Sequence, residues 1–228
     1  MTSPKRLAIV AGAGPGLGDA LLTRFAQGGY HAVGYSRRQR TSDPSIETRN
    51  LDLTDSDEVR AVTRELTDRH GPPAIVVHNP ARLVRGPLLE TPIAQFEEAW
   101  RSMALSAAIL AHNVIPAMVQ AVGGAFIVSG ATASLRGGAK FSAFASAKFA
   151  LRGLTQSLAR EFQSSGIHVS HVILDGIIDS DASRVLHGRD PNTMMKPADI
   201  AQAYWQLAHQ PSSAWTHELD LRPMSESF

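Results

Sequence analysis

Short apolar segments alternate with longer amphipathic segments along almost the whole chain, and this alternation limits the fold more than any other feature. The apolar segments have the length of strands, and the amphipathic ones have the length and spacing of helices. Strands and helices that alternate in this way form right-handed crossovers and a parallel sheet covered on both faces. We therefore predict an α/β fold with a doubly wound parallel sheet of about seven strands and helices on both faces.

The pattern also places the elements along the chain. Strands are expected at residues 7–11, 30–35, 46–51, 74–78, 124–129, 167–174 and 218–221. Helices are expected at residues 19–27, 56–68, 93–120, 141–164 and 197–209, with 93–120 either one long helix or two abutting ones. We find no internal repeat, low-complexity tract or linker, so residues 1–228 are assigned to a single domain.

Composition excludes several classes of protein. The net charge is +1, which gives no electrostatic case for binding nucleic acid or an anionic membrane. The chain has no Cys, which rules out disulfides and thiolate metal sites and fits a reducing compartment. Residues 1–6 are too few and too polar for a signal peptide, and no apolar run approaches the roughly 20 residues of a membrane span. We therefore expect a cytoplasmic protein.

A glycine-rich segment separates the first expected strand from the first expected helix. It reads Gly-Ala-Gly-Pro-Gly-Leu-Gly over residues 12–18. Glycines at the turn let the backbone approach a pyrophosphate closely, and the following helix points its free N–H groups at the phosphates. This placement predicts a dinucleotide-binding turn whose contacting residues are Gly12, Gly14, Gly16, Leu17 and Gly18.

The spacing of these glycines, Gly-x-x-x-Gly-x-Gly, resembles that of the short-chain dehydrogenase/reductase family. Asp52-Leu53 falls where that family contacts the adenine ring, and residues 78–81 resemble its Asn-Asn-Ala-Gly segment with Asn79 retained. Phe144 and Lys148 match its Tyr-x-x-x-Lys site, and residues 175–180 resemble the Pro-Gly-x-x-x-Thr segment around the nicotinamide. The resemblance runs from about residue 5 to the C-terminus.

This resemblance implies a Rossmann-type fold that binds a nicotinamide cofactor. It extends the cofactor-binding set beyond the glycine-rich turn to residues on five further segments. These are Ser36, Arg37, Arg38, Asp52, Leu53, Asn79, Lys148, Gly176, Ile177 and Ser180. It also implies a small-molecule substrate and a homodimer or homotetramer, in which the apolar helices at 93–120 and 141–164 either form the interface or pack in the core.

The end of the second expected strand bears on the choice of cofactor. A carboxylate there would bind the ribose hydroxyls of NAD and repel a 2′-phosphate, but this chain has Ser36-Arg37-Arg38. One charge-assisted contact of an Arg with phosphate gives roughly 1.5–3 kcal/mol, or about a 10- to 150-fold preference. We therefore predict NADP(H); the alternative is that these arginines, with Arg40, form a solvated turn.

Three of the four catalytic residues that the resemblance implies are missing. The family uses Tyr as the proton donor, Lys to lower the pKa of that Tyr, Ser to bind the substrate oxygen, and Asn to complete a proton path. Lys148 is present, one helical turn from position 144. The Tyr, Ser and Asn positions hold Phe144, Ala131 and Met103. General acid catalysis contributes about 10²- to 10⁴-fold, so ordinary carbonyl reduction should be very slow unless another group substitutes.

Several side chains are candidates for that substitution. Ser129 and Thr132 flank Ala131, although hydroxyls at strand ends more often satisfy the local backbone. Lys148 could transfer a proton itself if burial lowers its pKa, or it could only bind the nicotinamide ribose. Asp175 stands where the family has Pro, and could act as a base, orient a cationic substrate, or only bond the turn before Gly176.

Two histidines and one loop complete the candidate site. His78 and His112 could face the cofactor cleft, but a lone His is more often structural. Residues 180–196 are rich in polar residues, Gly and Pro and follow the carboxyl end of a strand, where ligands bind in such sheets. We interpret this segment as a substrate lid; the alternative is a surface loop.

Three functions remain open. The first is an NADP(H)-dependent oxidoreductase that acts on a carbonyl/alcohol, C=C or C=N substrate by a route without the usual Tyr. The second is a non-redox catalyst, an isomerase, dehydratase or cyclase, working in a pocket lined by Phe144, Met103 and Ala131. The third is a catalytically silent NADP-binding subunit or sensor. Fold alone does not choose among them.

Overall fold

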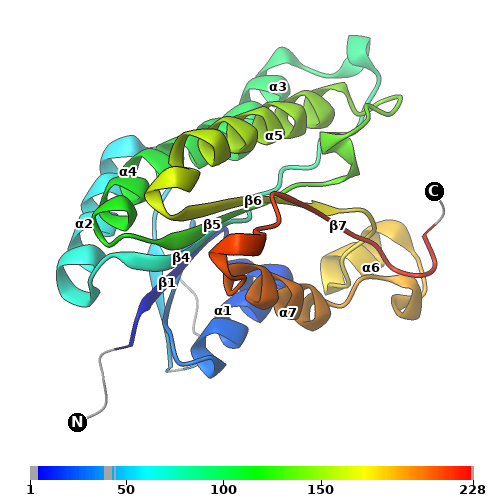
Figure 1. The fold of residues 1–228 in the computed structure, drawn as a ribbon. Coiled ribbons are helices and arrows are strands. Elements are labelled where there is room, and N and C mark those ends of the chain that lie inside the picture. The colour runs from blue at the N-terminus through cyan, green and yellow to red at the C-terminus, as the bar shows by residue number, and fades with distance from the viewer. Residues whose placement is uncertain (1–4, 39–42, 44, 227–228) are drawn as a thin grey trace.

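Seven parallel strands form one sheet in a computed structural model that describes residues 5–38, 43 and 45–226 (Figure 1). The strand order is β3-β2-β1-β4-β5-β6-β7, with every neighbouring pair parallel. The strands are β1 (Leu7–Ala11), β2 (His31–Ser36), β3 (Ile46–Asn50), β4 (Pro73–His78), β5 (Gly124–Ser129), β6 (Ile167–Leu174) and β7 (Glu218–Leu221). The predicted seven-stranded, doubly wound parallel sheet is confirmed.

Helices cover both faces of the sheet, as Figure 1 shows. One face carries α2 (Ser56–His70), α3 (Ile93–Trp100), α4 (Ser106–Gln120) and α5 (Ser142–Phe162). The other face carries α1 (Leu17–Gln27) and α7 (Pro197–Ala208), with the short α6 (Asp181–His187) beyond the carboxyl ends of the strands. α1 begins at Leu17, two residues before the expected start, because Gly16 occupies the N-cap position.

The alternation of side chains along each strand builds two cores. In β1, Leu7 and Ile9 pack with residues of α2, α4 and α5, whereas Ala8 and Val10 pack with residues of α1 and α7. Successive side chains of a strand point to opposite faces, so a strand buried on both faces is apolar throughout. Each fully buried Leu or Ile contributes about 1.5–3 kcal/mol, which makes the central strands the most strongly held part of the fold.

The expected helix at residues 93–120 is continuous but not uniform. α3 passes into a π-helical turn at Arg101–Leu105, which passes directly into α4. Among the described residues, Ile93–Gln120 is the stretch long and apolar enough to cross a membrane by length and composition alone, and half of its most apolar window is buried inside the protein. The buried apolar side chains of α4 belong to the core between α2, α5 and the sheet, which is the pattern of a core helix.

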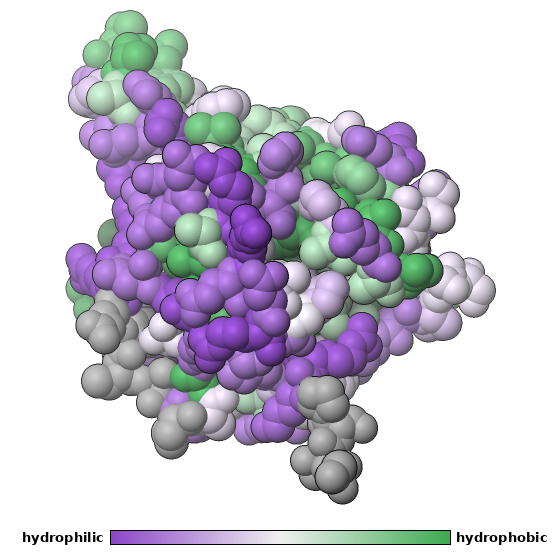
Figure 2. Space-filling view, turned by 90° about the vertical axis from the view of Figure 1, so that its left-hand side faces the viewer, coloured by the Kyte–Doolittle hydropathy of each residue, from purple (hydrophilic) through white to green (hydrophobic). Residues whose placement is uncertain are grey.

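The two edges of the sheet differ in character. The amino ends of the strands lie at the left of Figure 1, on the side that Figure 2 shows as mainly hydrophilic with a band of apolar surface. The carboxyl ends lie at the right of Figure 1, where α6 and the last strand also end. In parallel sheets of this topology ligands bind at the carboxyl edge.

Candidate active site

The segments predicted to bind cofactor and substrate meet at the carboxyl edge of the sheet. The glycine-rich turn follows β1, Asn79 follows β4, Ala131 follows β5 and Asp175 follows β6. Because all strands are parallel, these segments come together although they are up to about 160 residues apart in the chain.

The glycine-rich turn is fixed against the segment that follows β4. Gly12 has φ +88°, and a Cβ at this position would lie 2.8 Å from the backbone nitrogen of Pro80. Asn79 donates from Nδ2 to the carbonyl oxygen of Gly12 at 3.2 Å. Asn79 therefore holds the turn in place, and no residue with a side chain fits at position 12.

The start of α1 forms an open cradle next to the lid segment. Gly16 occupies the N-cap of α1 with φ +92°, and no described side chain caps this end of the helix. A Cβ at Gly16 would lie 3.6 Å from Cβ of Ser180, whereas one at Gly14 would meet nothing within 4 Å. Leu17 is buried in the core below, and Gly18 packs against the Gly12 carbonyl. Uncapped N–H groups beside open space suit an anionic phosphate, so these residues fit a dinucleotide.

The residues expected to select the cofactor lie at the outer end of this cradle. Arg37 and Arg38 are exposed, and the backbone N–H of Arg38 donates to Oγ of Ser36 at 3.3 Å. A hydrogen bond from the backbone of Thr54 lowers the pKa of Asp52, and the nearby charge of Arg37 lowers it further. Arg40 lies outside the described residues. Leu53 is buried in the core beneath this surface.

Lys148 is the buried cation of the site. Its side chain reaches from α5 to the end of β5, where Nζ donates to the carbonyl oxygen of Ser129 at 2.8 Å. The residue is 2% exposed, and burial lowers the pKa of its ammonium group to about 8. Nζ lies 5.8 Å from the centre of the Phe144 ring, which offers the cation a π face rather than a hydroxyl.

The three substituted positions are apolar in the structure as well as in the sequence. Met103 is fully buried in the π-helical turn and belongs to a small apolar cluster with Ala143 and Ala147. Phe144 is half-buried and packs against the same cluster. Ala131 follows β5 and is also half-buried. The wall that would carry the proton relay of the family is thus a hydrocarbon surface beside one ammonium group.

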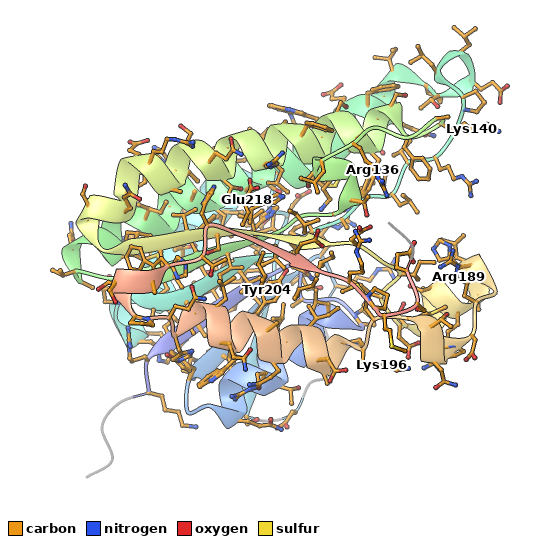
Figure 3. All side chains as sticks on the ribbon, turned by 45° about the vertical axis from the view of Figure 1, so that its right-hand side comes forward. Arg136, Lys140, Arg189, Lys196, Tyr204 and Glu218 are labelled. Atoms are coloured by element: carbon orange, nitrogen blue, oxygen red, sulfur yellow. The ribbon has the colours of Figure 1, made fainter. Side chains whose placement is uncertain are left out.

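The hydroxyl groups that flank Ala131 are engaged elsewhere. Ser129 Oγ lies 2.9 Å from the hydroxyl of Tyr204, which comes from α7 and lies between that helix and the sheet, on the face away from α5 (Figure 3). Thr132 donates from Oγ1 to the carboxylate of Asp175. The idea that one of these hydroxyls replaces the missing Ser is therefore not supported by their positions.

Asp175 is held by two partners at the carboxyl edge. It is 5% exposed, accepts the Thr132 hydroxyl on Oδ1, and forms an ion pair through Oδ2 with Arg222. The two contacts hold the carboxylate of Asp175 in place between a guanidinium and a hydroxyl, so it acts as an anchor at this edge of the sheet. Arg222 follows β7 directly and was missed from sequence, because a single Arg after a short strand carries no local signal.

His78 forms the floor of the site below Lys148. Its Nε2 lies 2.8 Å from Oγ of Ser106, whose own hydroxyl donates to the carbonyl oxygen of Ser102 at 2.7 Å, so Nε2 carries the proton that is shared. Burial, together with the nearby charge of Lys148, lowers the pKa of His78 to about 3. His78 is therefore neutral, whereas His112 is exposed on α4.

The segment at residues 180–196 is an ordered flap rather than an irregular loop. It contains α6 and a 3₁₀ turn at Pro191–Thr193, and its base is closed by a bridge between Ile178 and Met195. The backbone of Ile177 accepts from Met195 N at 2.9 Å, and a Cβ at Gly176 would lie 2.7 Å from Pro223.

Charges on the flap are paired around one carboxylate. Asp179 binds the guanidinium of Arg184 and the ammonium group of Lys196, and these partners lower its pKa to about 2. Figure 3 shows Lys196 and Arg189 on one side of the carboxyl edge and Arg136 on the other. Basic side chains therefore stand on both sides of the carboxyl edge of the sheet.

Known proteins resemble this chain in sequence and in fold. A family model described as short chain dehydrogenase matches residues 6–189. A short-chain dehydrogenase from Rhodopseudomonas palustris, solved as a crystal structure, is 34% identical, with 96% of this chain and 100% of that chain covered and a TM-score of 0.83. A 3-oxoacyl-(acyl-carrier-protein) reductase from Vibrio cholerae is 29% identical over 208 residues, which are 86% of this chain and 81% of that protein. A metagenomic short-chain oxidoreductase in complex with NADP is 24% identical, with 98% and 100% covered and a TM-score of 0.83, and shows the shared fold.

Proposed function

Because the chain belongs to the short-chain dehydrogenase family, we propose that it is an NADP(H)-dependent oxidoreductase that works without a tyrosine hydroxyl. The observation that carries this proposal is Lys148, a buried cation beside the Phe144 ring with a pKa lowered to about 8. Lys148 supports the proposal because it is a buried ammonium group able to hold a cofactor and release a proton, while the hydroxyls of Ser129 and Thr132 have partners elsewhere.

The cofactor would be held by the cradle at the start of α1 and by Lys148. Gly14 and Gly16 leave room for phosphate oxygens, and the uncapped N–H groups of α1 favour their negative charge. Arg37 and Arg38 are exposed at the end of β2, where a 2′-phosphate would require a cation. The choice of NADP(H) over NAD(H) rests on these two arginines, because the similar structure that contains NADP is too distant in sequence to decide it.

The apolar wall suits a substrate whose reduction needs little help from an acid. A nicotinamide cofactor bound in this cleft supplies a hydride. An iminium substrate already carries its proton on nitrogen, and an activated C=C bond takes up its proton at carbon, so neither requires a hydroxyl at position 144. Lys148 can release a proton near neutral pH, since burial brings the pKa of its ammonium group close to that range. Phe144 and Met103 would contact the hydrocarbon part of the substrate.

A second candidate is favoured by the loss of three polar positions together. Phe144, Ala131 and Met103 make the wall apolar, and such a wall suits a non-redox isomerase, dehydratase or cyclase or a silent NADP-binding subunit. Both candidates share the fold and the cofactor cradle. They differ in whether hydride leaves the cofactor.

Two measurements, made one after the other, test the proposal. Fluorescence titration of the purified chain with NADPH and NADH tests the cofactor, and equal or NADH-favouring affinity contradicts that part. NADPH carrying deuterium at C4 of the nicotinamide ring, incubated with ketones, enones and imines, then tests hydride transfer. Deuterium in an enone- or imine-derived product supports the oxidoreductase, whereas tight binding with no deuterium transfer across the panel favours the second candidate.

The proposal includes a homodimer or homotetramer in the cytoplasm. Trp100 on α3 and Phe149 on α5 are 46% and 44% exposed, which is unusual for large apolar side chains on neighbouring helices. α3 and α5 lie on the same face of the sheet (Figure 1), so a partner copy could cover both. Light scattering on the wild type and on Phe149→Glu tests this: a wild-type oligomer that the substitution dissociates is expected, and a monomeric wild type contradicts it.

A further inference from the structure

A second group of ligand-type side chains lies far from the cofactor cleft, at the amino edge of the sheet. His31 begins β2, Glu47 lies in β3 and His70 ends α2. One ligand atom from each residue lies within 4.8 Å of those of the other two. His31 Nε2 is 2.9 Å from Glu47 Oε2, and the imidazole rings of His31 and His70 stack with their centres 4.0 Å apart.

We propose that His31, Glu47 and His70 form a binding site for a zinc ion. Two imidazole nitrogens and one carboxylate oxygen are ligands that zinc prefers, at about 2.0–2.2 Å from the ion. The imidazole rings of His31 and His70 are stacked, so side-chain rotations that turn the rings out of the stack would be needed to aim both nitrogens at one tetrahedral ion. Water would complete the coordination, because the cluster is only half-buried.

One atom of the cluster points specifically to a ligand. Nε2 of His70 is buried and has no hydrogen-bond partner within the part of the chain that the structure describes. A buried imidazole nitrogen without a partner carries an energetic cost that a bound ion would remove. His70 is also the last residue of a 15-residue helix, whose carboxyl end favours positive charge.

The surroundings of Glu47 are arranged as in an outer coordination shell. Arg49 donates from Nε to Glu47 Oε1 at 2.8 Å, so Oε2 faces the two histidines. Arg49 and Arg69 each pair with Glu65 as well as with Oε1 of Glu47, so two carboxylates share the charge of two guanidinium groups beside the site. Hydrogen bonds of this kind orient a ligating carboxylate.

The position of the site assigns it a structural role. β3 is the edge strand of the sheet, and the three ligands join it to β2 and to the end of α2. β2 and β3 also carry the segments that lead to Arg37 and Asp52. An ion here would clamp the adenosine-binding half of the domain from the side opposite the cofactor.

The test uses the full chain without a histidine tag, freed of metal by a chelator. Calorimetric titration with ZnCl₂ should give one ion per chain, and CoCl₂ should give the visible absorption of tetrahedral cobalt. His70→Gln should lower zinc affinity by on the order of 10- to 100-fold or more and remove the cobalt bands. His112→Gln, which changes an exposed His of α4, should leave both unchanged.

Glu47→Gln is the second variant, because it keeps the shape of the carboxylate and should also weaken zinc binding. Circular dichroism before titration identifies any variant that fails to fold, and the remaining variant then carries the test. Absence of zinc binding by the wild type overturns the proposal. So does equal zinc affinity in folded His70→Gln, folded Glu47→Gln and His112→Gln, which would make the cluster a hydrogen-bonded group only.

Discussion

Nζ of Lys148 lies 5.8 Å from the centre of the Phe144 ring, one helical turn away on α5. The same ammonium group donates to the carbonyl oxygen of Ser129. The ammonium group of Lys148 therefore lies between the Phe144 ring and a backbone carbonyl group, and residue 144 offers it no hydroxyl as a hydrogen-bond partner.

The double variant Phe144→Tyr with Ala131→Ser should gain carbonyl reductase activity. It restores a hydroxyl next to Lys148 and a second one at the end of β5, where the family places its acid and its oxygen-binding group. The expected gain in NADPH-dependent ketone reduction is on the order of 10²- to 10⁴-fold. Phe144→Tyr with Thr132→Ser serves as the matched control, since Thr132 faces Asp175. No gain in the first double variant would mean that position 144 does not face the substrate.

Replacing Lys148 by Met should change how stability depends on pH. In the unfolded chain this Lys has an ordinary pKa of 10.5, whereas burial lowers its pKa to about 8 in the folded protein. Below pH 8 both states are protonated and the burial cost is fully present. Between pH 8 and 10.5 the folded state has lost its proton and the unfolded state has not, so stability rises with pH.

The corresponding free energy is on the order of 3 kcal/mol, for a pKa difference of about 2.5. Urea unfolding of the wild type and of Lys148→Met at pH 7, 9 and 10.5 measures this free energy. The other titrating groups are common to both proteins, so their effects cancel when one free energy of unfolding is subtracted from the other. Relative to Lys148→Met, the wild type should become more stable as pH rises through this window. If the difference in free energy of unfolding between the two proteins stays constant with pH, the ammonium group of Lys148 is solvated in the folded protein.

Removing the guanidinium of Arg37 should weaken the preference for NADPH. Arg37→Ala, alone or with Arg38→Ala, should reduce the ratio of NADPH to NADH affinity by about 10- to 150-fold, the value of a charge-assisted contact with phosphate. Arg64→Ala removes an exposed Arg from α2 and should leave the ratio unchanged. If all three variants keep the same ratio in titrations, the arginines at the end of β2 do not contact the 2′-phosphate.

Arg222→Gln should destabilise the fold much more than a matched surface change. It leaves the nearly buried carboxylate of Asp175 without its cation, and breaking a buried pair in this way costs about 3 kcal/mol or more. Arg60→Gln breaks an exposed pair with Asp57 on α2 and should cost only a fraction of that amount. Free energies of unfolding in urea compare the two, and similar losses would mean that Asp175 does not depend on Arg222.

The fold was largely predictable from sequence because its signals are local and repeated. Every expected strand exists within one residue of its expected start, and the parallel direction follows from the intervening helices. The π-helical turn at Arg101–Leu105 was not predicted, since its residues are as compatible with an α-helix as with a wider turn.

The candidate site was predictable in its apolar parts and less so in its polar ones. The direction of Ser129 follows from strand alternation, because Phe126 and Val128 face α5 and the residue after Val128 must face α7. The partner of Asp175 could not be found in this way. Arg222 follows β7 and lies 47 residues after Asp175 in the chain. Only the order of strands in the sheet, with β7 beside β6, brings Arg222 and Asp175 together.

The π-helical turn has a consequence for how this chain tolerates changes of length. A π turn contains one residue more than an α turn, while the helices on either side keep the faces they present to their neighbours. α3 and α4 would therefore keep their packing if one residue of Arg101–Leu105 were deleted and the turn relaxed to an α-helix. Met103 lies in this turn, so the helix segment that packs near Phe144 is also the place where deletion of a single residue would disturb the surrounding helix least.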